Sequence, residues 1–202
     1  MSRGIAISLV IVVAIALIAI AAASILHDGL SSRAKPTALE SMLARNARHL
    51  AIPAGARSMQ NLVAETQENL RDARLHFADH CAICHANDGS GDTPMGRNLY
   101  PKPPDLRREE TQKLGDGELF WIIENGVRFT GMPAFGGARG SQEDSWKLVR
   151  FIRHLPQLTA EERMEMERYN PKGPEDLEEE QEENDFLRGA PMQQKPEGTH
   201  HH

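Results

Sequence analysis

The chain has 202 residues, a formal net charge of −6 and only two cysteines. This length leaves room for about one domain once terminal extensions are set aside, and two cysteines exclude a disulfide framework. The charge is uneven: residues 161–185 hold 12 acidic and 3 basic side chains, a net of −9, which leaves +3 for the remainder. We therefore expect a mildly basic body with an acidic tail, and no nucleic-acid partner.

The N-terminal segment is apolar from Ile5 to Leu26, interrupted by only two serines. A helix needs roughly 20 apolar residues to span a bilayer, whereas the apolar part of a signal peptide is usually about 7–15 residues long. We therefore predict an uncleaved transmembrane anchor over residues 1–27. A cleaved signal peptide is the alternative, because Arg3 precedes the run and small residues near 21–23 could be cleaved.

Residues 28–60 are predicted to form a tether that lets the rest of the chain stand off the membrane. Serine, proline and glycine recur in this segment at irregular positions. A short helix is expected within it from Thr37 to Leu50, because leucine and methionine side chains recur there on one side.

The next segment, residues 61–158, is predicted to be one small all-helical body. Amphipathic helices are expected over about 62–81, 116–126 and 141–156. Asp116 is placed to cap the second of these helices and Gly126 to end it. The Gly/Pro-rich loops between them are long, and no alternating strand pattern appears. Because such loops are unusual in a compact domain, we expect a bulky buried cofactor to order them.

Residues 159–202 form a polar, acidic tail. Its few apolar side chains cannot offset the entropy lost on ordering, so we predict that the tail is largely disordered. A short helix is expected only near Glu161–Tyr169. The terminal histidines, His200–His202, are either the remnant of an expression tag or a native end.

Both cysteines lie in the string Cys81-Ala-Ile-Cys84-His85, which is a signature of c-type haem attachment. Each thiol can add to one vinyl group of a haem, and His85 then lies against the iron as an axial ligand. The alternatives are a thioredoxin-like redox pair, which needs a βαβ context, and a zinc site, which needs two further ligands nearby. The βαβ context is absent, and His76 and His80 lie nearby but precede the cysteine pair, so we expect one covalent haem.

The second axial ligand is predicted to be Met132, which lies between Gly131 and Pro133. Met95 is the other candidate. A thioether ligand raises the haem potential relative to a second histidine. It also leaves the iron no open position, which favours electron transfer over ligand binding or catalysis.

Separated motifs carry a resemblance over residues 62–158 to the class I c-type cytochromes, and in particular to the membrane-anchored bacterial monohaem type. The matching strings are Phe77-x-x-x-Cys81-Ala-Ile-Cys84-His85, Gly89-Ser-Gly-Asp92, Leu99-Tyr-Pro-Lys-Pro-Pro-Asp-Leu106, Asp116-Gly-Glu-Leu-Phe-Trp-Ile-Ile-Glu-Asn-Gly126, Thr130-Gly-Met-Pro-Ala-Phe135 and Trp146-Lys-Leu-Val-x-Phe-Ile-Arg-x-Leu155. The resemblance implies an all-α, cytochrome c-like fold. It also implies that Phe77 on the first helix of the body packs against the last helix near Trp146 and Phe151.

The same resemblance implies roles for residues around the haem. The carbonyl of a proline, expected to be Pro104, would accept a hydrogen bond from Nδ1 of His85 and fix the ring. Tyr100 or Trp121 could donate a hydrogen bond to a haem propionate. The alternative for both aromatic residues is simple packing around the cofactor.

The expected function is therefore the transfer of single electrons, and not catalysis. The chain would act as a free carrier or as a subunit of a respiratory or photosynthetic complex, with the bilayer and redox proteins as partners. Haem attachment in this family occurs outside the cytoplasmic membrane, which implies a single-pass protein with a periplasmic haem domain. The alternative function is a haem-based sensor with a labile sixth ligand; a peroxidase would need a second haem motif or a separate catalytic domain.

Overall fold

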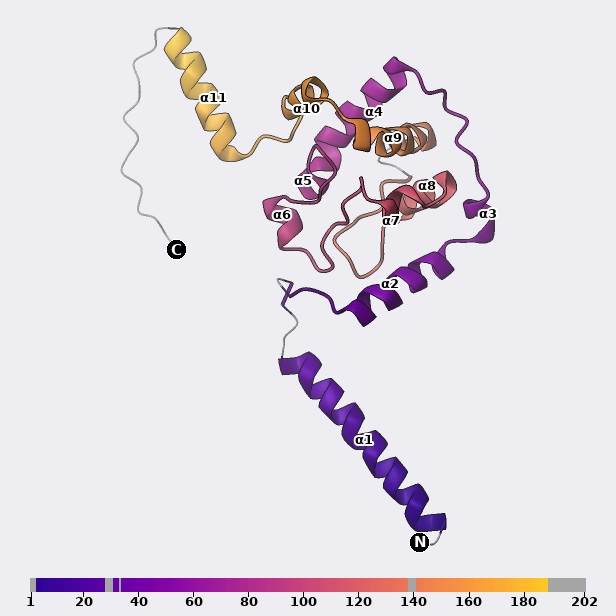
Figure 1. Cartoon of the computed structure of the whole chain (residues 1–202). Helices are drawn as coiled ribbons and strands as arrows, with labels where there is room; N and C mark the ends of the chain where they lie inside the picture. Colours follow the sequence, from indigo (N-terminus) through magenta and orange to yellow (C-terminus); the bar gives the residue numbers. More distant parts are fainter. Residues whose placement is uncertain (1–2, 28–30, 33, 138–140, 189–202) are drawn as a thin grey trace, which may run out of the picture.

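The computed structural model describes residues 3–27, 31–32, 34–137 and 141–188, and within these ranges the chain is helical with no strand (Figure 1). The expected all-α class is confirmed. The helices are α1 Arg3–His27, α2 Ala38–Ala51, α3 Ala54–Arg57, α4 Gln67–His80, α5 Ala82–His85, α6 Pro94–Arg97, α7 Glu109–Gln112, α8 Asp116–Asn125, α9 Gln142–His154, the 3-10 helix η1 Leu155–Gln157, α10 Ala160–Glu167 and α11 Pro174–Leu187.

The packing of α4 against α9 forms the centre of the fold. Phe77 of α4 meets Phe151 of α9 edge to face, with ring centroids 5.1 Å apart, and Ala73 is buried in the same core. Trp146 of α9 stacks on Phe120 of α8, with centroids 4.1 Å apart. Helix α9 therefore joins α4 through Phe151 and α8 through Trp146.

The N-terminus of α8 differs from the sequence expectation. Gly115 is the cap residue, and its amide donates to the Glu118 carboxylate at 2.8 Å. Asp116 does not cap the helix, because its carboxylate accepts hydrogen bonds from Arg153 of α9 at 2.8 and 3.0 Å. At the other end Gly126 closes the helix with a φ of +65°, as predicted.

The packed core continues past residue 158 into α10. Arg74 of α4 is 7% exposed and pairs with Glu162 at 2.6 Å and with Glu165. Met166 is fully buried. The tail is thus helical over α10, near the expected short helix, and again over α11, where glutamates that favour helix formation dominate; residues 189–202 lie outside the described chain.

The segment before α4 also packs on the body in part. Ile52, which follows α2, is 1% exposed. Gly117 of α8 lies so close to α3 that a Cβ atom there would stand 1.9 Å from the carbonyl oxygen of Ala56. The predicted tether over 28–60 therefore includes a part that is docked on α8.

Helix α1 presents apolar side chains over its described length. Exposed fractions of its large apolar residues lie between 50% and 69%. The unbroken run of described side chains covers residues 7–23. When only described residues are considered, no helix qualifies as long and apolar enough to cross a membrane, so the structure does not support the transmembrane part of the expected architecture.

We predict that Arg74→Met lowers the free energy of unfolding at pH 7 by about 2 kcal/mol, between the values typical of exposed and buried ion pairs. Hydrogen bonds from Arg74, and then from Arg71, hold the pKa of Glu165 below its ordinary value of 4.5. The contribution of these hydrogen bonds to the free energy of unfolding is therefore present above about pH 4.5. It is lost as the pH falls below that value and Glu165 becomes protonated. Urea unfolding from pH 7 to pH 3 should show the variant and the wild type converging in acid.

Lys113→Met is the matched control, because Lys113 and Glu109 form an ion pair whose side chains are both more than 70% exposed. This variant should unfold like the wild type at every pH. An equal loss in both variants would contradict a special contribution from Arg74.

Candidate functional site

The string from Cys81 to His85 lies at the junction of two helices. Helix α4 ends at His80, and the amide of Cys81 donates to the Phe77 carbonyl at 2.8 Å. Helix α5 then carries the rest of the string. The His85 carbonyl accepts from the Gly91 amide at 2.8 Å, which folds the following loop back onto the motif.

The two thiols are protonated at neutral pH. Burial raises the pKa of Cys81 to about 12, and burial also raises the pKa of Cys84. A redox-active pair requires a lowered thiol pKa. The environment therefore disfavours the thioredoxin-like alternative, and it is compatible with thiols that are consumed in covalent bonds.

His85 is a neutral imidazole in a buried position. Burial lowers its pKa to about 4, partly opposed by the backbone carbonyl of Pro104, which faces the ring. Nδ1 is buried and makes no hydrogen bond of ordinary distance and angle. A neutral imidazole is the form that binds a metal, and the orienting role expected of the Pro104 carbonyl stays a prediction.

The loop that carries Pro104 depends on two glycines. Gly91 has a φ of +75°, and a Cβ atom there would lie 2.7 Å from the Pro103 carbonyl oxygen. Gly89 also has a φ of +75°, and its carbonyl accepts from the Leu106 amide at 2.8 Å. Only glycine allows the 89–91 turn to approach the 103–106 segment this closely.

Met132 lies in the loop between α8 and α9. Its amide donates to the Thr130 hydroxyl at 3.1 Å, and its carbonyl accepts from the Val127 amide at 3.2 Å. The side chain is half-buried. These bonds hold the loop in a tight turn at the position predicted for the second ligand.

Contacts through α6 connect this loop with the motif. Gly96 of α6 lies against the Cys84 carbonyl, and a Cβ atom there would be 2.7 Å from that oxygen. Leu99, just after α6, lies equally close to Gly131. Met95, the other candidate ligand, lies on α6 itself and is 48% exposed.

Sequence reasoning missed the residue that fixes α6, which is Thr93. Its hydroxyl donates to the Ile83 carbonyl at 2.7 Å and accepts from the Gly96 amide at 2.8 Å. The signal was present, because threonine followed by proline is typical of a helix N-terminus.

The two aromatic candidates have separate surroundings. The Tyr100 hydroxyl donates to the Glu40 carboxylate of α2 at 3.1 Å, a partner that the sequence did not indicate. Trp121 is half-buried on α8, and its carbonyl accepts from the Asn125 side chain. The haem-propionate role suggested for each stays a prediction.

The surroundings of the motif fit a flat apolar group. Ile83 within the motif is 50% exposed, and Phe129 beside the Met132 turn is 92% exposed. An apolar group bound between the two segments would remove both side chains from water. Among the described residues no group of three or more His, Cys, Asp or Glu side chains is placed to hold a metal ion.

A protein-family model described as cytochrome c oxidase, cbb3-type, subunit III matches residues 68–152. This part of the chain is a c-type cytochrome domain. No curated protein matches the chain. The cytochrome domain carries covalently bound haem c, and its function in broad terms is haem-based electron transfer.

We predict that Gly91→Ala destabilises the cytochrome domain by more than the roughly 1–2 kcal/mol of left-handed backbone strain, because the new Cβ must also displace Pro103. The displacement moves the neighbouring Pro104 carbonyl away from His85. Denaturant unfolding should report the loss, and the midpoint potential should shift with it.

Gly137→Ala is the control for strain alone. Gly137 has a φ of +83°, and a Cβ atom there would meet nothing within 4 Å. The control should lose about 1–2 kcal/mol and keep the wild-type potential. Equal effects of the two substitutions would contradict the importance of the close approach at Pro103.

Proposed function

We propose that this chain is a membrane-held electron carrier with a single haem, which Cys81 and Cys84 would attach and whose iron His85 and Met132 would hold. The observation that carries the proposal is the buried, neutral His85 imidazole at the end of α5, beside two protonated thiols. The chain has one such motif and no other cysteine, which supports a single haem.

Residues of the chain set the properties of the site. When bound, the haem supplies an iron that accepts and releases one electron. The Pro104 carbonyl, which faces the His85 ring, would orient it and increase its basicity when the haem is bound. The Met132 thioether would hold the iron together with His85, which would raise the potential and keep small ligands away.

The experiment that tests this function is the substitution Met132→Ala in the haem-loaded protein. The oxidised wild type should show the weak near-infrared band of sulfur-to-iron charge transfer, and the variant should lose it completely. The midpoint potential should fall, because the soft ligand is gone. Absorption spectra and a redox titration give both results.

Met95→Ala is the control, because it removes a methionine from α6 and leaves the Met132 turn intact. It should keep both the band and the potential. A wild type that lacks the band and readily binds carbon monoxide when reduced would contradict the carrier function. That result would support the alternative, a haem sensor with a labile sixth ligand.

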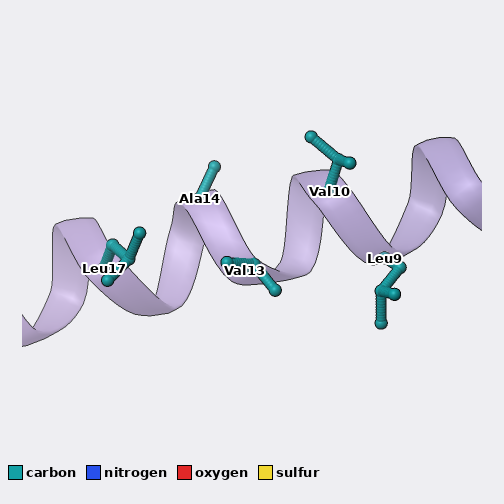
Figure 2. Close-up of a pocket in the computed structure, with 5 residues that line it drawn as sticks. All are labelled: Leu9, Val10, Val13, Ala14 and Leu17. Atoms are coloured by element: carbon teal, nitrogen blue, oxygen red, sulfur yellow. The ribbon is translucent and has the colours of Figure 1, made fainter.

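The proposed membrane attachment depends on α1. Figure 2 shows Leu9, Val10, Val13, Ala14 and Leu17, apolar side chains of this one helix that line a shallow surface depression. The apolar run in the sequence, from Ile5 to Leu26, extends beyond the side chains that the structure describes. An apolar surface of this size in water is unfavourable, and a bilayer would cover it on all sides.

We predict that Val13→Arg combined with Leu17→Arg releases the chain from membranes, because each arginine near the middle of a span costs about 3 kcal/mol. The measurement is the fraction that resists alkaline carbonate extraction. Val13→Leu with Leu17→Val is the control and should stay bound. A wild-type chain that is extracted, or one whose mature N-terminus lies near residue 22, would contradict the attachment.

The partners are proposed to be other redox proteins of the same membrane, with the haem domain in the periplasm. The matching family model is described as a subunit of an oxidase, which supports membership of a multi-subunit complex. The acidic segment 161–185 could attract a basic partner at low salt. Purification in mild detergent, followed by identification of co-purifying subunits, separates a complex subunit from a free carrier.

A further inference from the structure

Helix α2 turns its polar side towards the cytochrome domain. Ser41 and Arg48, two turns apart on one face, are the only partly covered residues between Ala38 and Ala51. Both are polar. An amphipathic helix on a globular domain ordinarily shows the opposite arrangement, with its apolar side against the core.

Specific polar contacts hold α2 in this orientation. Nδ1 of His49 pairs with the Glu118 carboxylate of α8 at 3.0 Å, and the hydroxyl of Tyr100 donates to Glu40 at 3.1 Å. The Thr37 amide donates to the other Glu40 oxygen at 2.7 Å. Glu118 is 8% exposed. The helix is therefore attached at both ends, from Glu40 in its first turn to His49 in its last.

The opposite side of α2 is apolar and uncovered. Leu39, Met42, Leu43 and Leu50 recur at helical spacing on this side, with exposed fractions of 61%, 46%, 56% and 79%. We call these four residues the α2 apolar face. Because the polar contacts point it away from the domain, folding of the described chain alone does not cover it.

We propose that the α2 apolar face lies in the interfacial layer of an anionic bilayer and sets the orientation of the cytochrome domain on the membrane. This inference rests on the proposed attachment through α1. Only residues 28–37 separate the end of α1 from the start of α2, so α2 must stay near any bilayer that holds α1.

Charge favours lipid over another protein as the occupant of this face. Residues 31–52 contain four basic side chains and one acidic side chain. The acidic one, Glu40, is already engaged by Thr37 and Tyr100. The side chains of Lys35, just before the helix, and of Arg45, one turn after Met42, are exposed and can reach phosphate headgroups. A helix with apolar residues on one side and basic residues near the boundary is typical of interfacial membrane binding.

The attachment would orient the cytochrome domain. Tyr100 and Glu118 lie on its α2 side, so that side would be held towards the bilayer. An electron partner in the same membrane would then always approach the same side of the domain. A domain on a flexible tether would instead turn freely.

The test uses the full-length, haem-loaded chain in nanodiscs that contain anionic lipid, with one nitroxide label at Leu43→Cys or at Ala44→Cys. Both positions are exposed, but only the first is on the α2 apolar face. Covalent haem attachment leaves the introduced cysteine as the only free thiol. The ratio of collisions with oxygen to collisions with a water-soluble nickel complex should be several-fold higher at 43 than at 44.

Each other outcome overturns the inference in a distinguishable way. Chains that stay in the discs but show equal ratios at 43 and 44 refute the lipid contact and leave the α1 attachment intact. Chains that are not retained in the discs refute both proposals. Dipolar broadening between labels at 43, absent at 44, would assign the face to a second copy of the chain and not to lipid.

Discussion

Burial of the His85 imidazole is the constraint on which the rest of the site depends. An uncharged ring is available to a metal only if it is kept from protonation, and burial achieves this by lowering the pKa to about 4. That burial requires the loop after the motif to close tightly over the ring. The left-handed turn at Gly89 and Gly91, and the contact with Pro103, give the loop this path.

The helices around the site form a frame that holds the His85 loop in its closed path. The edge-to-face contact of Phe77 with Phe151 joins α4 to α9, and the motif begins where α4 ends. Arg74 extends the frame to α10 through a nearly buried ion pair. The frame is therefore larger than the segment matched by the family model, which ends at residue 152.

The surface of the chain divides into covered and uncovered apolar regions. The core side chains of α4, α8 and α9 are buried against each other, whereas α1 and one side of α2 are apolar and exposed. Bonds from Glu40 and His49 to the domain direct the apolar side of α2 outwards. Both exposed regions are explained if a bilayer surrounds the first and underlies the second.

The sequence by itself determined the helical class, the haem motif and the approximate ends of α2, α8 and α9, because these depend on local patterns such as Cys81 to His85 and Gly126. Only the tertiary structure decided which side of α2 faces the domain, that Asp116 pairs with Arg153 instead of capping α8, and that α10 joins the core. These features depend on contacts between residues far apart in the chain. The sequence around a polar side chain such as Glu118 or Arg74 does not indicate which distant residue that side chain will contact.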